Sequence, residues 1–330
     1  MAIKIEIQEK VGRLDRFLVS LHSEIPRSQW ESWIRGGNVL VNGIPATKNG
    51  QILHVGNIVE TELPNIAPPA TYLIPEAMDL PTLYEDERLW IINKPMGMVV
   101  HPGPGHPAAT VLNALLARIG SNAFSVEKQN ENEDISEGDY EINQAWPGLV
   151  HRLDRYTSGC MAMAKDENAK TCLQDQFKAR TVEKTYLAIA RQSRKLPEIG
   201  SILISAPIAR HRVDRTKMTI HSKGKEAHTR IKVISKSMGL ALVACEILTG
   251  RTHQIRVHLS SIGAPLLGDP LYGGATTWQD KSANPLTCPY PALHSWKLSL
   301  DHPNGKRLNV LAELPDQFEQ YIIAFGLQSF

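Results

Sequence analysis

The sequence has little that would point to a metal site, a disulfide framework or a membrane span. Its four cysteines, Cys160, Cys172, Cys245 and Cys288, are far apart and form no CxxC pair, unlike zinc sites and disulfide-rich domains. No apolar run reaches the ~18 residues of a membrane helix, and the polar start MAIKIEIQEK lacks a signal-peptide core. A phosphate-cradling glycine loop and a dinucleotide fingerprint are also missing. We therefore expect a cytoplasmic protein with no membrane segment, no metal and no cofactor.

The positive charge of the chain is unevenly distributed. With 330 residues, 42% hydrophobic and 21% charged, the composition predicts a globular protein of two domains. The net charge is only +2, yet residues 151–330 hold twenty-five Lys and Arg against fifteen acids. Seven acids lie in residues 127–141, which predict a solvated acidic insertion at about 121–145. Without that insertion the chain is basic, which permits nucleic-acid binding.

The first sixty residues predict a small module of two helices and a sheet. Apolar residues recur at helical spacing over 14–21 and again over 30–34, and the second helix ends at Gly36-Gly37. The alternating run 39–44 contains Asn42-Gly43, a hairpin signal. The helix pair carries basic side chains that either lie along RNA phosphates or are simply solvated: Arg13, Arg16, Arg27 and Arg35.

Five prolines follow this module and predict a stiff, extended linker over residues 64–82. They are Pro64, Pro68, Pro69, Pro75 and Pro81.

The stretch GLVHRLDRYTSG, residues 148–159, concentrates ionisable groups between apolar runs. Leu149 and Val150 predict a short buried strand, and residues 160–164 predict another. Between them lie Arg152 and Asp154 in a charged loop. A loop held by rigid strands often presents catalytic groups to a cleft, although a solvated surface turn is the alternative.

Three later segments carry further candidates. Tyr186 lies on a predicted strand, where its ring either packs in the core or stacks on a base and relays a proton. In TGRTHQIRVHL, Thr252 is expected to cap a helix, with Arg251 and His253 at an N-terminus that favours anions and Arg256 one turn in. In PIARHRVDRTKM, a cationic cluster favours phosphate binding over a solvated loop: Arg210, Arg212, Arg215 and Lys217.

These blocks carry a resemblance to a known family. HRLDRYTSG, KTY, PIARHRVDRTKM and GRTHQIRVHL, in this order, resemble the RluA family of RNA pseudouridine synthases, and VVHPG with TVLNALL resembles its RluD-like branch. RLDRFL, RSQWESWI and GNVLVNG resemble the S4-type RNA-binding fold over residues 12–60. The resemblance implies an α+β fold in which a small α/β RNA-binding domain, 1–63, precedes a catalytic domain, 83–330. The catalytic domain would have a mixed, largely antiparallel sheet flanked by helices.

The resemblance also implies a reaction, the conversion of uridine in RNA to pseudouridine. The bond from ribose carbon 1′ to nitrogen 1 is broken and remade to carbon 5, with no atoms gained or lost. Asp154 would be the nucleophile, adding to ribose or to the uracil ring, and Arg256 its cationic partner. Tyr186 would stack on uracil and assist deprotonation at carbon 5. Arg152 would enter the RNA where the uridine is flipped out, and Arg251 and His253 would contact phosphate or substrate.

Ribosomal RNA, from the large subunit, is the expected partner rather than transfer RNA, and we expect a monomer. Two other functions remain open. A non-catalytic RNA-binding or ribosome-assembly protein would keep the basic surfaces, with Asp154 only structural. A glycosidase or nucleoside hydrolase would need paired carboxylates or a metal, whereas the blocks offer one Asp among many Arg residues.

Overall fold

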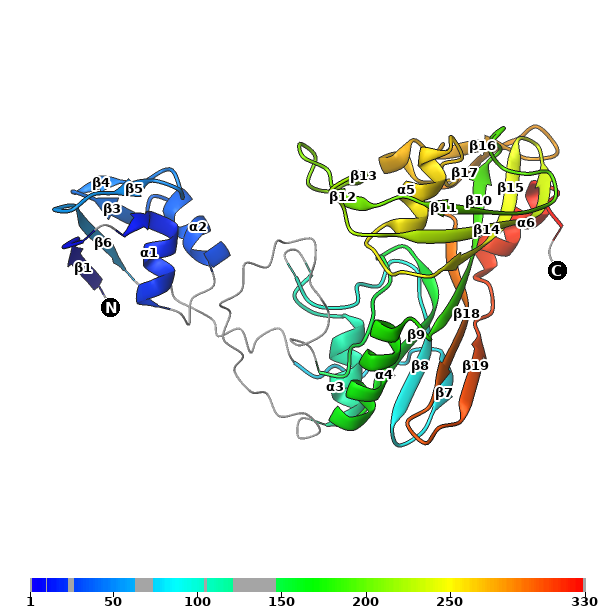
Figure 1. Cartoon of the computed structure of the whole chain (residues 1–330), viewed down its shortest axis with the longest axis horizontal. Coiled ribbons are helices and arrows are strands. Elements are labelled where there is room, and N and C mark those ends of the chain that lie inside the picture. The colour runs from blue at the N-terminus through cyan, green and yellow to red at the C-terminus, as the bar shows by residue number, and fades with distance from the viewer. Residues whose placement is uncertain are drawn as a thin grey trace. The chain divides into compact units, whose positions relative to one another are not determined.

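The computed structural model of the chain describes residues 2–9, 11–22, 27–62, 74–103, 106–120 and 147–328 (Figure 1). The side chains of residues 2 and 27–29 lie outside that description, as do the expected acidic insertion, 121–145, and residues 64–73 of the expected linker. The described residues fall into two compact units, 2–62 and 74–328, and each is described by itself.

The first unit packs two helices on a small sheet with strand order β1-β6-β3-β4. Leu14, Phe17 and Leu18 form a buried stripe on the first helix and meet Trp30 and Ile34 of the second. Arg13 ends a strand directly before the first helix rather than lying on it. The elements are β1 Ala2–Glu6, β2 Gly12–Arg13, α1 Leu14–Leu21, α2 Arg27–Arg35, β3 Val39–Val41, β4 Ile44–Pro45, β5 Ile52–Leu53 and β6 Ile58–Glu62.

The second unit is built on one nine-stranded sheet, with β19 paired to β18 and the other strands in the order β11-β14-β15-β10-β18-β9-β8-β7. Its strands are β7 Thr82–Glu85, β8 Leu89–Lys94, β9 Ser158–Ala164, β10 Glu183–Arg191, β11 Gly200–Ser205, β12 Ile208–Arg210, β13 Met218–Ile220, β14 His228–Ser237, β15 Leu240–Ile247, β16 Thr277–Gln279, β17 Pro285–Thr287, β18 Leu293–Asp301 and β19 Arg307–Leu311. Its helices are α3 Val111–Ile119, α4 Glu167–Ala179, α5 Gln254–Ser261, the short 3-10 helix η2 Pro270–Tyr272 and α6 Asp316–Ala324.

The large sheet is antiparallel except where β9 and β18 run parallel. Alternate residues of its strands face opposite cores, as the period of two in a strand requires. Trp90 and Ile92 join a core with α3 and α5, whereas Leu89 and Ile91 join one with α4. A third core, beneath α6, is formed with the opposite faces of β10 and β15. The expected α+β architecture, with a mostly antiparallel sheet flanked by helices, is confirmed.

Gly159 allows the sheet to bring the site together. It pairs with Lys94 of β8 on one side and with Ser295 of β18 on the other, and Ser295 in turn pairs with Tyr186 of β10. The φ angle of Gly159 is +109°, and a Cβ atom there would lie 2.2 Å from the Ser295 carbonyl oxygen. Only glycine permits this close approach, which sets Lys94 and Tyr186 in one row across four strands.

The described end of the proline-rich segment packs against the second unit. Asn113 of α3 donates to the Ile74 carbonyl over 2.8 Å, its own carbonyl accepts the Glu76 N–H over 3.0 Å, and Leu80 is buried in the core. No helix in the described part of the chain is long and apolar enough to cross a membrane.

Candidate active site

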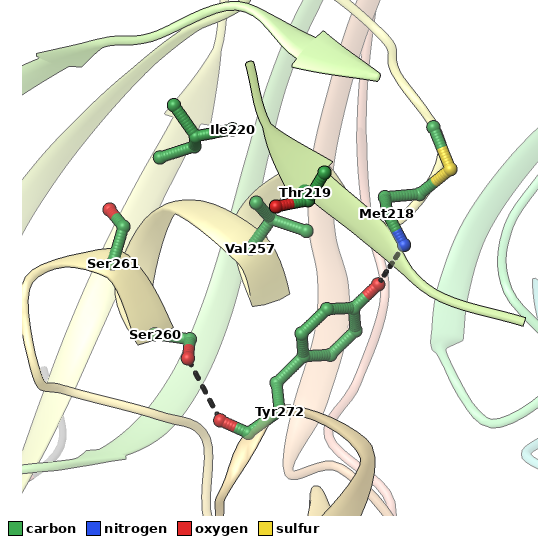
Figure 2. A pocket seen from close by; sticks show the side chains of 7 residues that line it. All are labelled: Met218, Thr219, Ile220, Val257, Ser260, Ser261 and Tyr272. Atoms are coloured by element: carbon green, nitrogen blue, oxygen red, sulfur yellow. Dashed lines mark hydrogen bonds between the residues drawn. The ribbon is translucent and has the colours of Figure 1, made fainter. Parts of the chain in front are cut away.

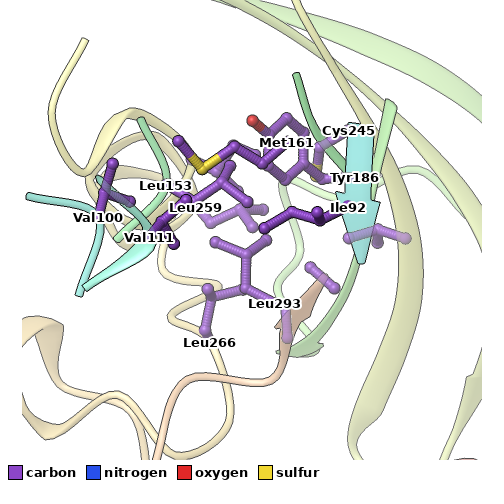
Figure 3. Packing of buried hydrophobic residues seen from close by; sticks show 14 of the residues in the cluster. Ile92, Val100, Val111, Leu153, Met161, Tyr186, Cys245, Leu259, Leu266 and Leu293 are labelled. Carbon is purple, nitrogen blue, oxygen red and sulfur yellow. The ribbon is translucent and has the colours of Figure 1, made fainter. Parts of the chain in front are cut away.

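Asp154 lies in the loop that enters β9. Leu153 is 4% exposed and packs in the core below the loop (Figure 3), so the next side chain turns outward. The Thr157 N–H donates to the Asp154 carbonyl over 3.0 Å and closes a tight turn. The expected strand at Leu149-Val150 reduces to a single bridge between Leu149 and Met163. Asp154 thus leads into one core strand instead of lying between two.

Arg256 holds two carboxylates at once. Its Nη1 donates to Asp154 Oδ2 over 3.2 Å, while Nε and Nη2 donate to both oxygens of Asp269 over 2.7 and 2.9 Å. Burial lowers the pKa of Arg256, but the bonds to Asp269 and the charge of Asp154 outweigh it, so the pKa is raised and the cation persists. A bidentate bond of this kind fixes the plane of the guanidinium. Asp269 therefore aims Arg256 at Asp154.

His253 approaches the same carboxylate from the start of α5, and Tyr272 of η2 contacts the His253 ring. His253 Nε2 lies 3.8 Å from Asp154 Oδ2, and its Nδ1 lies 2.8 Å from the Tyr272 hydroxyl. That hydroxyl also accepts the Met218 N–H of the β12–β13 hairpin (Figure 2). Burial raises the pKa of Tyr272 to about 12 and lowers that of His253. A protonated phenol that donates to Nδ1 leaves the Nε2 hydrogen pointing at Asp154.

The expected cap of this helix is wrong. His253 rather than Thr252 is the N-cap residue; it has a left-handed φ of +55° and its side chain makes no capping hydrogen bond. Instead, Nδ1 of the ring contacts the Tyr272 hydroxyl and Nε2 faces Asp154. Capping preferences in the sequence cannot predict these contacts.

Lys94 is buried beneath the loop. Its ammonium donates to the carbonyls of Pro95, Met98 and Arg155 over 2.9, 2.9 and 3.2 Å. Burial lowers its pKa to about 7, and the charge of Asp154 opposes that fall. The side chain ties the end of β8 to the residue that follows Asp154, so it supports the loop from inside.

Tyr186 lies on the face of β10 that is shared with α3 and α5, and it is 6% exposed (Figure 3). Burial raises its pKa, the neighbouring Ser295 side chain lowers it by less, and the charge of Asp154 raises it further. The phenol therefore stays protonated at neutral pH, within electrostatic reach of the carboxylate. The structure thus brings together Asp154, Tyr186 and Arg256.

Comparison with known proteins identifies the family of each unit. Residues 88–261 match the family of RNA pseudouridylate synthases, and residues 12–59 match the S4 domain. The chain belongs to the RNA pseudouridylate synthase family. It is an isomerase that acts on RNA, and the likeness seen in the sequence to the RluA family and to the S4-type fold is confirmed.

Several relatives match almost the whole chain. A Bacillus subtilis protein named as the uncharacterized RNA pseudouridine synthase YlyB is 37% identical over 317 residues, 96% of this chain and 94% of the relative. Ribosomal large subunit pseudouridine synthase D of Pseudomonas aeruginosa is 36% identical, covering 93% and 89%. The structure of human RNA pseudouridylate synthase domain containing 4 superposes with a TM-score of 0.54 at 26% identity, covering 76% of this chain and 94% of that one.

Arg152 and Arg251, which were expected to bind RNA, have different surroundings. Arg152 is exposed, and its charge lowers the pKa of both His101 and His253. Arg152 therefore lies on the solvent-exposed side of the active site. No described residue accepts a hydrogen bond from its side chain. Arg251 instead donates to the Glu226 carbonyl over 3.1 Å at the start of α5.

The cationic cluster after Pro207 lies on the β12–β13 hairpin. Arg212 and Arg215 are exposed in the connection between the two strands. Arg210 donates to the Arg215 carbonyl over 2.8 Å, and Lys217 lies 3.7 Å from the Asp214 carboxylate. The hairpin reaches the active site through Met218 and Tyr272.

The S4 domain keeps some of its expected cations exposed. Arg16 and Arg35 face solvent, whereas Arg13 forms a bidentate bond to the buried Asp15 over 3.0 and 2.8 Å. The side chain of Arg27 lies outside the described residues.

Sequence reasoning missed Asp269, Lys94 and Tyr272. A signal was present for the first, because Asp269 lies between Gly268 and Pro270 in the turn-rich stretch GDPLYGG, within the basic residues 151–330. Lys94 is the last residue of a buried strand, but nothing in its neighbours shows that it turns inward.

Proposed function

We propose that this synthase isomerises specific uridines of large-subunit ribosomal RNA, with Asp154 as the nucleophile. The observation that carries the proposal is the asymmetric bonding of the carboxylate. Arg256 and His253 both approach Oδ2, and no described residue bonds Oδ1. One oxygen is thus held while the other remains free to attack a ribose or uracil carbon, and the side chain is 22% exposed.

Tyr186 and Arg152 complete the proposed set. The ring of Tyr186 stacks on the uracil while Asp154 holds one fragment, which keeps the base in place as it rotates. Because its pKa is raised, its hydroxyl assists deprotonation at carbon 5 by relaying a proton rather than as a phenolate. The exposed guanidinium of Arg152 fills the gap that the extruded uridine leaves in the RNA.

The choice of ribosomal RNA rests on the relatives. Ribosomal large subunit pseudouridine synthase D from Xanthomonas campestris is 33% identical over 94% of this chain, and the Pseudomonas protein carries the same name. In this proposal the RNA phosphates are contacted by exposed cations, namely Arg16, Arg35 and the hairpin residues Arg212 and Arg215. We further propose that the protein acts in the cytoplasm, where ribosomal RNA is made in bacteria, and that it acts as a monomer.

Mapping pseudouridines tests this proposal. Ribosomal and transfer RNA from cells that lack the protein are compared with RNA from cells that express wild type, Asp154→Asn or the exposed control Asp175→Asn. We expect one or more sites in large-subunit ribosomal RNA to disappear and to return with wild type and with Asp175→Asn only. Sites that are lost only from transfer RNA would refute the substrate, and recovery with Asp154→Asn would refute the nucleophile.

RNA binding separates catalysis from assembly. Asp154→Asn should bind the mapped RNA within about two-fold of wild type, because phosphate contacts supply most of the affinity. An assembly protein without catalysis would give unchanged pseudouridines in both variants. Free uracil among the products would instead indicate a hydrolase.

A further inference from the structure

Two tyrosines outside the proposed catalytic set stack on one another beside the active site. The rings of Tyr156 and Tyr290 have centroids 4.0 Å apart and planes only 10° from parallel. Tyr156 follows Asp154 by two positions, and Tyr290 lies in the connection that leads into β18. Tyr290 is 40% exposed although Tyr156 stacks on its ring, so a large part of the residue outside the stack meets solvent.

Tyr290 is held in place by the loop that carries Asp269. Gly268 has a φ of +74°, and a Cβ atom there would lie 2.0 Å from the Tyr290 carbonyl oxygen. The Ala292 N–H donates to the Leu267 carbonyl over 2.8 Å. The exposed ring is therefore fixed by backbone packing, and the stacked pair joins the Asp154 loop to the loop that aims Arg256.

A cation accompanies the two rings. The guanidinium carbon of Arg155 lies 5.2 Å from the centre of the Tyr156 ring. Its Nε donates to the Gly97 carbonyl over 3.1 Å, and its Nη1 lies 3.0 Å from His106 Nε2. Arg155 is exposed, and no acid in the described part of the chain pairs with it. A fixed, unneutralised cation next to exposed aromatic rings is suited to RNA, which offers phosphates and flat bases.

We propose that Tyr290, backed by Tyr156, is a stacking site for a base that neighbours the target uridine, with Arg155 facing the adjoining phosphate. The inference rests on the proposed function. Extruding a uridine deprives its neighbours of a stacking partner, and an aromatic ring at the mouth of the site restores one. Every base has a flat face, so the site selects a geometry of the RNA rather than a particular base.

The test uses a stem-loop with the mapped uridine in three forms: intact, abasic at the 5′ neighbour and abasic at the 3′ neighbour. Wild type, Tyr290→Leu and Tyr290→Phe are compared in KM and in the single-turnover rate. We expect Tyr290→Leu to raise KM on intact RNA about ten-fold, the size of one stacking interaction. One abasic RNA should raise the wild-type KM similarly and should cost Tyr290→Leu nothing further. Tyr290→Phe, which keeps the ring, should stay within about two-fold of wild type.

The inference would be overturned if the rise in KM caused by Tyr290→Leu and the rise caused by the abasic RNA simply multiplied when combined. An equal loss by Tyr290→Leu on all three RNAs would also overturn it. Either result would mean that the two tyrosines only hold the loops together. A second measurement does not depend on how the variant folds. RNA with 2-aminopurine at one or the other neighbour should lose fluorescence on binding wild type at one of the two positions, and no loss at either would also overturn it. Pseudouridine formation on intact RNA by wild type tests the proposed function separately.

Discussion

The loop that carries Asp154 and the loop that carries Asp269 present carboxylates to the same guanidinium, yet in opposite ways. Both oxygens of Asp269 accept hydrogen bonds from Arg256 and its side chain is 1% exposed, whereas Asp154 receives one bond and is 22% exposed. The buried pair fixes the cation, and the cation fixes one oxygen of the exposed partner. The two acids share the cation of Arg256, so the difference between their roles comes from the difference in their burial.

Backbone packing explains why the second loop is the anchor. The Gly274 N–H donates to the Asp269 carbonyl over 2.7 Å, and a Cβ atom on Gly274 would lie 1.8 Å from the Leu266 carbonyl oxygen. Side chains are excluded there, so the chain closes tightly around Asp269.

The largest difference between the two acids should appear in stability. Asp269→Asn removes a charge from a buried ion pair and should lower the free energy of unfolding by about 3–5 kcal/mol. Asp154→Asn, at a partly exposed pair, should change it by less than about 1 kcal/mol. Urea unfolding of both variants measures these changes in the free energy of unfolding. Equal losses would contradict the view that Asp269 fixes Arg256 whereas Asp154 is the reactive group.

Replacing the shared cation should uncouple the two loops. Arg256→Lys keeps a charge but cannot make two parallel bonds to Asp269 and a third to Asp154, so the single-turnover rate should fall by about 10²-fold. Arg230→Lys is the matched control, because Arg230 pairs with Glu246 on exposed strand surface. A rate for Arg256→Lys within three-fold of wild type would contradict the role given to the guanidinium.

Lys94 sharpens the comparison, since it supports only the Asp154 loop. Its pKa falls from 10.5 to about 7 on folding, so the unfolded chain binds more protons between pH 7 and 10.5. The stability of wild type should therefore rise with pH across this window relative to Lys94→Met, by about 2 kcal/mol from pH 7 to 9. Chemical unfolding at both pH values checks the sign, with the exposed Lys232→Met as control. No change between the two pH values would show that the ammonium stays charged throughout, and so would contradict the lowered pKa.

The smallest effect is expected at His253, which approaches Asp154 at 3.8 Å and has no counterpart at Asp269. Its pKa is lowered by burial and by the charge of Arg256, so the ring is neutral at pH 7 and acts as a weak donor. His253→Gln, which retains a donor, should slow the single-turnover rate by only about two- to five-fold. A hundred-fold loss of the single-turnover rate would show that His253 takes part directly in the chemical step.

Much of the fold follows from local pattern. Helical spacing anticipated α1 and α2, and a strand was predicted at Tyr186, where β10 lies. The parallel pairing of β9 with β18 joins residues more than a hundred positions apart through Gly159, and nothing near Gly159 in the sequence indicates it.

The site was predictable to a similar depth. Asp154, Tyr186 and Arg256 were named through resemblance to a family, and the structure brings them together. Asp269 and Tyr290 were not, because their importance lies in contacts made across the fold. Thr252 was misjudged as a cap since capping preferences ignore a strained residue such as His253, whose ring is used elsewhere.

The structure of Asp154→Asn bound to its mapped RNA is the most direct test of the account. The account predicts the target uridine extruded over Tyr186, with the side-chain position that corresponds to Oδ1 within about 3.5 Å of ribose carbon 1′ or of a uracil ring carbon. A uridine that remains stacked in the RNA, or one that is extruded but meets Arg256 and Asp269 while position 154 faces away from it, would contradict the account.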